Sequence, residues 1–362
     1  MTVRRLLPIG VPIAAALAVA ALYAAGFTGD VSLSARGLAV AAAILGILVV
    51  TVFSAVHHAE VIAHRLGEPL GTLVLTLAVT IIEVALIASI MWNKDDPTLA
   101  RDTVFAVIMI VCNGIVGTCI VIGAVRYREQ EFQVQGASAY LIVLAPLSVF
   151  TLVLPNYTTT TTGPTFSNLQ LEFISLVTIL IYCIFLFIQT GRHQNYFQAS
   201  GQRAELHDPP STRATIVSAI CLVVALVVVI LLAKLFAVIL EIGLTHLAAP
   251  RAFAGVVVAL LVLLPEGVSA MRAARNDVLQ KSLNLALGSS LATIGLTIPA
   301  VAIISLWSGK DLVLGLRPSE TVLLVLTLFV SLLTFGTGRT NVLSGFVHLV
   351  VFLTFLFLVF AP

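Results

Sequence analysis

Eleven long apolar runs, separated by short polar connections, make up most of this 362-residue chain. A helix needs about 20 mostly apolar residues to cross the hydrocarbon core of a bilayer, and most of the runs reach that length. Only 10% of the residues are charged and 59% are hydrophobic, so a soluble fold would lack the charges to cover its surface. The sequence therefore predicts an all-α polytopic membrane protein. Its eleven transmembrane helices are expected at residues 5–26, 37–58, 70–91, 103–125, 138–154, 170–189, 212–240, 251–271, 280–305, 319–335 and 342–361.

The longest polar connection divides these helices into two sets of five behind one extra N-terminal helix. We predict this N-terminal transmembrane helix at 1–36, a first five-helix repeat at 37–190, a cytoplasmic linker at 191–211 and a second repeat at 212–362. Since five is an odd number of crossings, the two repeats must have opposite topologies. Inverted repeats of this kind are typical of secondary transporters.

The charges in the loops predict the orientation. With the N-terminus in the cytoplasm, twelve Lys and Arg residues of the loops lie inside and six lie outside, as the positive-inside rule favours. The first run is nearer span length than signal-peptide length and is expected to be retained. The predicted location is the bacterial inner membrane, with the C-terminus outside.

Two glutamates, Glu83 and Glu266, lie deep in predicted spans. Each is in the second span of its repeat, about two-thirds of the way along. Ionisable side chains in hydrocarbon cost a few kcal/mol or more, so they usually face the interior of the helix bundle and serve a function. Because the two spans run in opposite directions, both carboxylates could meet near the midplane. The alternative is a structural role as neutral, hydrogen-bonded glutamates.

The following span of each repeat has glycines beside polar side chains. These residues are Asn113 and Gly114 in the first repeat, and Gly288, Ser289 and Ser290 in the second. Such sequences let a membrane helix loosen and free carbonyl oxygens for an ion, although close packing of small residues is an alternative explanation. Carboxylates, hydroxyls and carbonyls together form an all-oxygen site, which suits Ca²⁺ or Na⁺ and not Zn²⁺.

Several histidines also lie near or within spans. His57, His58 and His64 cluster at the end of the second predicted helix, and a proton relay or pH sensor is the hypothesis there, because histidine titrates near neutrality. The alternative is a solvated helix end. His348, in the last span, is predicted to be a packed residue.

Parts of both repeats resemble a known family. Residues 67–83, from Gly-Glu-Pro-Leu-Gly to Glu83, and residues 265–290, from Pro-Glu-Gly to Gly-Ser-Ser, resemble the bacterial Ca²⁺/H⁺ antiporters of the Ca²⁺/cation antiporter superfamily. The resemblance implies that Glu83 and Glu266 are the paired cation and proton carriers, with further ligands from Asn113–Gly114 and Gly288–Ser290. Some members exchange Na⁺ or K⁺ for protons. Residues 191–213 lack the acid-rich stretch of many relatives, which keeps Na⁺ and K⁺ open.

The predicted function is secondary active exchange of Ca²⁺ for protons by alternating access, with Na⁺ or K⁺ as the alternative cation. A cation channel and an intramembrane enzyme are alternatives from other classes, but the chain shows no filter loop and no catalytic motif. The expected partners are membrane lipid, the transported cations and protons, with no cofactor. A net charge of +2 gives no signal for nucleic-acid binding, and the sequence predicts no oligomeric state.

Overall fold

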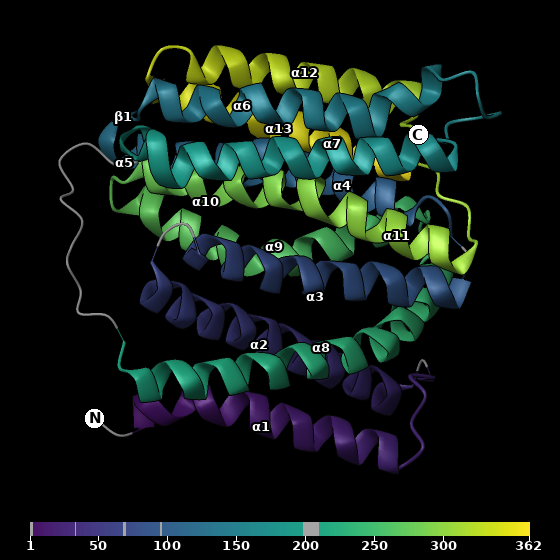
Figure 1. Ribbon diagram of the computed structural model, residues 1–362. Coiled ribbons are helices and arrows are strands. Elements are labelled where there is room, and N and C mark those ends of the chain that lie inside the picture. Colours follow the sequence, from purple (N-terminus) through teal and green to yellow (C-terminus); the bar gives the residue numbers. More distant parts are fainter. Residues whose placement is uncertain (1–2, 33, 68–69, 95, 198–209) are drawn as a thin grey trace. The chain divides into compact units, whose positions relative to one another are not determined.

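The structure is a computed structural model that describes residues 3–32, 34–67, 70–94, 96–197 and 210–362, most of them helical (Figure 1). The α-helices are α1 (Val3–Ala24), α2 (Ala35–Leu66), α3 (Leu70–Lys94), α4 (Leu99–Met109), α5 (Val116–Tyr127), α6 (Val134–Ser148), α7 (Asn168–Phe187), α8 (Thr212–His246), α9 (Ala252–Arg275), α10 (Leu279–Ala292), α11 (Ile298–Ser308), α12 (Pro318–Phe335) and α13 (Val342–Phe360). Two short strands, β1 (Glu129–Glu131) and β2 (Arg339–Asn341), form an antiparallel pair.

Short segments of π- or 3-10 helix extend or link several of these helices. The π segments are η1 (Ile110–Ile115), η2 (Val149–Val153), η4 (Ile188–Arg192) and η6 (Thr293–Thr297), and the 3-10 segments are η3 (Leu154–Tyr157) and η5 (Gln194–Phe197). Because η1 joins α4 to α5 and η6 joins α10 to α11, each of these pairs forms one continuous span.

Ten helical segments of the described chain are long and apolar enough to cross a membrane, and α1 adds a shorter apolar helix at Ile9–Ala24. The prediction of an all-α polytopic membrane protein is therefore confirmed. Five of the ten precede residues 198–209 and five follow them, as the two predicted repeats require. Most of the predicted linker, residues 198–209, lies outside the described residues.

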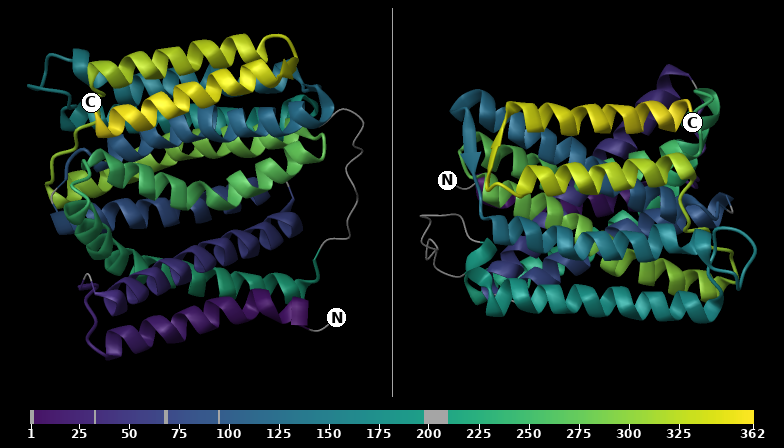
Figure 2. Two further views of the ribbon diagram at one scale, coloured as in Figure 1. Left: turned by 180° about the vertical axis from the view of Figure 1, so that it is seen from behind. Right: turned by 90° about the horizontal axis from the view of Figure 1, so that it is seen from above.

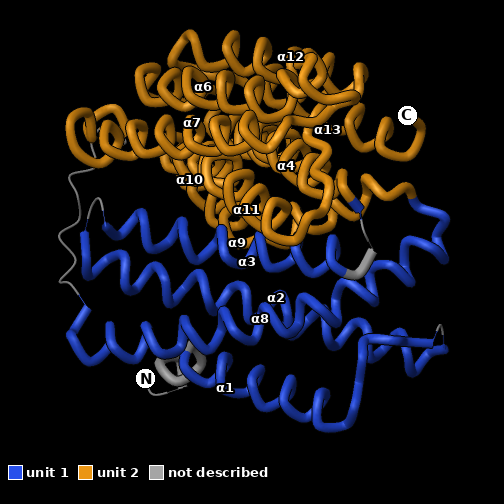
Figure 3. Tube along the Cα trace, turned by 45° about the vertical axis from the view of Figure 1, so that its right-hand side comes forward, with its two compact units in different colours: residues 1–96, 206–249 blue, residues 97–205, 250–362 orange. Residues whose placement is uncertain are grey.

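The chain folds into two compact units, coloured separately in Figure 3. Unit 1 comprises residues 1–96 and 206–249, and unit 2 comprises residues 97–205 and 250–362. Each unit thus takes helices from both predicted repeats. The units describe how the chain packs, whereas the four predicted sequence segments describe chain order and stay a prediction.

Unit 1 is built around α8, which packs along α1, α2 and α3. The ends of the helices are fixed by caps: the Ser34 hydroxyl accepts a hydrogen bond from Gly37 N at the start of α2, and Ser211 does the same for Ala214 N at the start of α8. Arg65, in the last turn of α2, donates to the carbonyl oxygen of Pro210. The two caps fix where α2 and α8 begin. The contact of Arg65 joins the end of α2 to the residues that precede α8.

Unit 2 carries a pattern of pairings that reflects inverted repeats. At one end, β1, between the third and fourth spans of the first repeat, pairs with β2, between the fourth and fifth spans of the second. At the other end of α6, Thr165 follows the fourth span of the first repeat and pairs with Val313, which follows the third span of the second. At each end, therefore, the connection after the third span of one repeat pairs with the connection after the fourth span of the other. A pseudo-twofold axis in the membrane plane, which relates the two halves of inverted-repeat transporters, produces this exchange.

Helix packing in unit 2 follows the same exchange. The third span of the first repeat, at η1, packs against α13, the fifth span of the second. The third span of the second repeat, at η6, packs against α7, the fifth span of the first. Figure 2 shows α13 beside α12, to which β2 connects it. Each π segment is therefore enclosed by helices of the opposite repeat.

Loosening of the third spans was predicted, and the structure places it in these π segments. η1 contains Asn113 and Gly114, as expected, but Gly288–Ser290 lie in the regular α-helix α10 and the second π segment begins at Thr293. Pro299 explains this position, because it has no N–H to bond the carbonyl of Gly295, four residues earlier. Serine hydroxyls alone do not interrupt the helix.

The close approach of α4 and α9 depends on a glycine. A Cβ added at Gly255 would lie 2.7 Å from backbone atoms of Asp102 and Thr103, which cannot move aside as a flexible side chain would. We expect Gly255→Ala to lower the thermal melting temperature of the purified protein, with an overpacking cost of about 1–3 kcal/mol. Gly46→Ala is the matched control, since nothing lies within 4 Å of its added Cβ. Equal melting temperatures for the two variants would contradict the packing described here.

Candidate functional site

The two predicted carriers occupy corresponding places in the chain. Glu83 lies on α3 in unit 1 and Glu266 lies on α9 in unit 2, each in the second span of its repeat. Glu83 is only 1% exposed and Glu266 is half-buried. Two carboxylates at equivalent depths of apolar helices are the strongest functional signal in the chain, because a buried ionisable group is costly unless it serves a function.

A line of threonines leads along α3 to Glu83. Thr72, Thr76 and Thr80 precede it at intervals of four, four and three residues, which places all four side chains on one face of the helix. Exposure falls along this line: Thr72 and Thr76 are half-buried and Thr80 is buried. Sequence reasoning missed these hydroxyls, although their helical spacing was visible. They place hydroxyl groups of unit 1 on the same helix face as its carboxylate.

In unit 2, α9 packs against η1 and α10, the two segments that carry the other predicted site residues. A Cβ added at Gly267, next to Glu266, would lie 3.3 Å from Ile115 Cδ1 of η1. On the α10 side, the Ser282 hydroxyl donates to Ala270 O of α9 at 2.7 Å. The helix α9 runs through Pro265 without ending. Unit 2 therefore brings together the helices of Glu266, Asn113–Gly114 and Gly288–Ser290.

Ser290 is one of four buried serines of the described chain whose side chains have no hydrogen-bond partner. It is fully buried, and within the described ranges its Oγ has no hydrogen-bond partner. Ser148, by contrast, donates to the carbonyl of Leu144 in its own helix. A buried hydroxyl left without a partner costs roughly 1–3 kcal/mol, so its presence needs a reason. Binding of a cation through oxygen is one such reason, and it agrees with the predicted role of Gly288–Ser290.

Asn113 is fully buried and takes part in a hydrogen-bond network. Its Nδ2 donates to Thr327 Oγ1 at 2.9 Å, and its Oδ1 lies 3.0 Å from Nδ1 of His348. The neighbouring carbonyl of Gly114 accepts from the Thr118 hydroxyl at 2.7 Å. The carboxamide oxygen has two lone pairs, so one remains after the bond to His348. His348 was expected only to pack, and the structure gives it hydrogen bonds at both ring nitrogens.

The three predicted relay histidines have different surroundings. His58 is 2% exposed and its Nδ1 lies 3.2 Å from Ser218 Oγ of α8, whereas His57 and His64 are exposed. Successive residues of a helix point about 100° apart, which explains why His57 faces out and His58 faces in. Only His58 has the burial expected of a relay, and the relay role stays a prediction.

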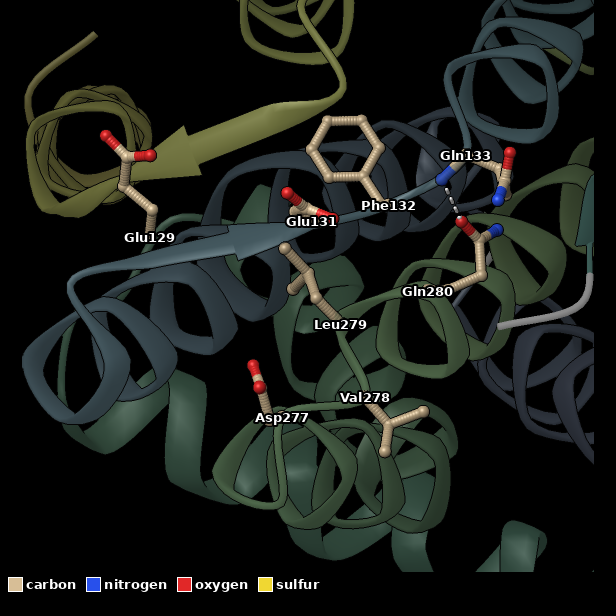
Figure 4. Close-up of a pocket in the computed structure, with 8 residues that line it drawn as sticks. All are labelled: Glu129, Glu131, Phe132, Gln133, Asp277, Val278, Leu279 and Gln280. Carbon is tan, nitrogen blue, oxygen red and sulfur yellow. Dashed lines mark hydrogen bonds between the residues drawn. The ribbon is translucent and has the colours of Figure 1, made fainter. Parts of the chain in front are cut away.

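A pocket of about 370 Å³ opens in unit 2 where β1 meets the turn between α9 and α10 (Figure 4). Glu129, Glu131 and Asp277 contribute carboxylates to its lining, and Gln133 N donates to Gln280 Oε1 across it at 2.7 Å. In the described part of the chain no three acidic, histidine or cysteine side chains are grouped closely enough to hold a metal ion. The pocket contains none of the predicted site residues.

Polar side chains continue from this pocket along one face of α10. Gln280 Nε2 donates to Asn284 Oδ1 at 2.9 Å, and Gly288 follows at the next interval of four residues. A Cβ added at Gly288 would lie 3.8 Å from the hydroxyl of Tyr140, which itself accepts a hydrogen bond from Gln189. The absence of a side chain at Gly288 therefore leaves space beside a polar group.

This fold, with inverted repeats, loosened third spans and a glutamate within each apolar second span, defines a secondary ion transporter. The chain matches the sodium/calcium exchanger protein family over residues 36–191 and 217–361, which is most of its length, and it belongs to that family. The resemblance to the Ca²⁺/cation antiporters is thereby confirmed, as is the expectation of an integral membrane antiporter.

Two curated relatives match over most of their length. The chain is 48% identical to a protein of Sinorhizobium fredii described as putative ionic transporter y4hA, over 88% of this chain and 87% of the relative. It is 41% identical to the sodium-potassium/proton antiporter ChaA of Escherichia coli, over 88% of each chain. A Ca²⁺/H⁺ antiporter of Synechocystis is more distant, at 25% identity over 64% of this chain and 66% of the relative.

Solved structures agree on the fold. Native YfkE superposes with a TM-score of 0.72 at 16% identity, covering 97% of this chain and 99% of that one. The H⁺/Ca²⁺ exchanger CAX gives a TM-score of 0.72 at 14% identity, covering 98% of this chain and 89% of that one. At these identities the likeness establishes the architecture of the helices.

Removing the Ser290 hydroxyl tests its role without adding bulk. We expect Ser290→Ala to raise the apparent KM for the transported cation and to leave the melting temperature unchanged or higher, because an unsatisfied buried group is removed. Ser175→Ala is the control: its Oγ is also buried and without a partner among the described residues, but it lies outside the predicted site. The same KM for Ser290→Ala and wild type would remove Ser290 from the site.

Proposed function

We propose that this protein is a cation/proton antiporter of the bacterial inner membrane that exchanges Ca²⁺ for protons, with Glu83 and Glu266 as shared carriers. The observation that carries the proposal is the matched pair of glutamates, one in the second span of each repeat, in a chain of the sodium/calcium exchanger family. The loop charges support an orientation with the N-terminus in the cytoplasm and the C-terminus outside.

Exchange follows from the cost of an unneutralised carboxylate in an apolar site. A carboxylate taken out of water needs a compensating proton or cation, since an unpaired buried charge costs several kcal/mol. A site with two carboxylates is neutral with one Ca²⁺ or with two protons. The empty site would carry two negative charges, so only the loaded forms change the side to which they open. This restriction converts binding competition into coupled exchange by alternating access.

The remaining ligands would be oxygens from both repeats. We propose that the hydroxyls of Thr80 and Ser290 supply ligands in addition to the carboxylates, together with the carboxamide oxygen of Asn113 and backbone oxygens near Gly114 and Gly288–Ser290. A hard cation such as Ca²⁺ takes six to eight oxygens in flexible geometry, which a set of carboxylates, hydroxyls and carbonyls can supply. The buried, partner-free Oγ of Ser290 supports this arrangement among the described residues.

Na⁺ or K⁺ in place of Ca²⁺ is the second candidate. The relative with 41% identity is named a sodium-potassium/proton antiporter, whereas the Ca²⁺/H⁺ antiporter of Synechocystis is 25% identical. The same oxygen-rich site would serve either kind of ion. Fluorescence of a pH-sensitive dye in everted membrane vesicles, recorded after addition of Ca²⁺, Na⁺ or K⁺, distinguishes them directly.

Each carrier can be tested by an isosteric change. We expect Glu83→Gln and Glu266→Gln each to abolish cation-dependent proton movement, because the amide neither releases a proton nor supplies a full negative charge. Insertion and melting temperature should change little, since a neutral glutamine is no harder to bury than a protonated glutamate. The assay is proton flux in proteoliposomes after addition of the cation.

Glu172→Gln provides the control for these variants, because Glu172 is an exposed glutamate near the start of α7. It should exchange at the wild-type rate. Robust exchange by a correctly inserted Glu83→Gln or Glu266→Gln protein would remove that residue from the mechanism.

The pH dependence of the cation KM tests whether the cation and protons compete for the same two carboxylates. Lowering the pH on the cation-binding side protonates the carboxylates, so the apparent cation KM should rise while the rate at saturating cation changes much less. Well below both pKa values of the pair, affinity should fall by up to ~100-fold per pH unit, and well above both the dependence should vanish. Initial rates over a grid of pH and cation concentration give both parameters. A KM that does not vary with pH would show independent sites for cation and proton.

A further inference from the structure

A continuous chain of buried polar groups connects η1 to α12 and α13 within unit 2. Thr334 Oγ1 of α12 lies 3.1 Å from His348 Nε2 of α13, and His348 Nδ1 lies 3.0 Å from Asn113 Oδ1 of η1. Asn113 Nδ2 then donates to Thr327 Oγ1, again on α12, at 2.9 Å. Asn113, His348 and Thr327 are 0% exposed and Thr334 is 7% exposed. Ionisable side chains are costly in apolar spans and usually serve a function there, so a histidine hydrogen-bonded at both ring nitrogens indicates a functional role.

The direction of the hydrogen bonds follows from the acceptor at the far end. The Thr327 hydroxyl donates its proton to Met109 Sδ at 3.4 Å, so its oxygen must accept from Asn113 Nδ2. The carboxamide oxygen of Asn113 therefore faces His348 and accepts a proton from its Nδ1. With the proton on Nδ1, the other ring nitrogen, Nε2, is an acceptor and is matched by the hydroxyl of Thr334.

We propose that His348 is a positioning residue for Asn113 in the cation site, and that Thr334 selects the imidazole tautomer this requires. The inference rests on the proposed function. An N–H at His348 Nδ1 holds the carboxamide oxygen of Asn113 in place and leaves its second lone pair available to the cation. If the amide rotated by 180°, its NH₂ group would face that N–H and would offer the cation a donor, which repels it.

In the other repeat, a different residue type lies against the π segment. At η6, the corresponding fifth span is α7, and it presents Tyr182: a Cβ added at Gly295 would lie 2.8 Å from Tyr182 Cβ. η6 thus meets an aromatic side chain at a close helix contact, where η1 meets a histidine bonded to its asparagine. The two π segments therefore differ in the residue that the opposite fifth span brings against them, and the proposal about His348 concerns η1 alone.

The expected size of the effect is that of losing a hydrogen bond that orients a metal ligand. Loss of a group that orients a ligand typically lowers affinity by ~10–100-fold. Because the cation binds before the loaded site opens to the other side, the loss should appear in KM and much less in kcat. If His348 only filled space, its replacement would lower the melting temperature and leave the cation KM and kcat of the folded protein unchanged.

Three variants separate positioning from packing. His348→Leu removes both hydrogen bonds and should raise the cation KM about tenfold or more, with kcat within about threefold of wild type. Thr334→Val keeps the shape of the threonine but removes the donor that selects the tautomer, so its KM should rise by a smaller factor. His348→Gln restores an N–H for Asn113 and an acceptor for Thr334, so its KM should return to within about threefold of wild type.

The decisive measurement is a double-mutant cycle in proteoliposomes, with initial rates over cation concentration. In an Asn113→Ala background, His348→Leu should raise KM no further, since the group that it positions is gone. The inference is overturned if His348→Leu leaves KM unchanged, if His348→Gln is as impaired as His348→Leu, or if the effects of Asn113→Ala and His348→Leu multiply. Should His348→Leu fail to insert, Thr334→Val with and without Asn113→Ala carries the same comparison.

The wild-type and Glu266→Gln proteins keep this inference distinct from the proposed function. Absence of cation/proton exchange in wild type, or exchange by Glu266→Gln equal to wild type, would contradict the proposed function. Exchange in wild type that is lost in Glu266→Gln, together with an unchanged KM in His348→Leu, would overturn the inference about His348 alone.

Discussion

The account depends on the cost of placing a carboxylate where water cannot solvate it. Glu83 is 1% exposed on a mostly apolar helix, and Glu266 has the equivalent place in the second repeat. Such a group is stable when a proton, a cation or a set of hydrogen bonds compensates its charge. A transporter can use that requirement, because each compensating ion displaces the other. In the proposed mechanism, the threonines of α3 and the hydroxyl of Ser290 would serve as neutral oxygens that complete a cation's coordination without adding further charge.

Inverted repeats give the chain two versions of each part of the transport machinery, and unit 2 shows how they are joined. The pairing of β1 with β2 at one end and of Thr165 with Val313 at the other exchanges the roles of the two repeats. The π segments η1 and η6 lie in the third span of each repeat and pack against the fifth span of the other. In both, i→i+5 bonding widens the helix locally, as is frequent at functional sites. The two copies differ in chemistry, since a histidine bonds η1 and a tyrosine packs at η6.

Much of this architecture can be predicted from the sequence, because hydropathy alone reports the spans and a glutamate in an apolar run is conspicuous. The ten long spans and the family agree with that prediction.

Other features depend on tertiary contacts that a pattern of residues does not contain. The division into compact units joins α8 to the first three helices, although α8 begins the second repeat. The second π segment is displaced toward Pro299, because a missing donor affects a helix more than the serines do. The sequence predicts His348 to be a packed residue, and only the positions of Asn113 and Thr334 reveal its hydrogen bonds. The threonines of α3 were visible at helical spacing, but which helix face is buried is decided by its neighbours.

The central claim is that protons drive cation movement through this protein, and uphill transport tests it most directly. Purified protein is reconstituted into liposomes that are acidic inside, with equal cation concentrations on both sides, and accumulation of Ca²⁺, Na⁺ or K⁺ is followed with time. The account predicts that at least one of these cations accumulates inside against its gradient, and that the accumulated ion leaves again when an ionophore collapses the pH gradient. A cation that moves only down its own gradient, at a rate independent of the pH difference, would contradict the account.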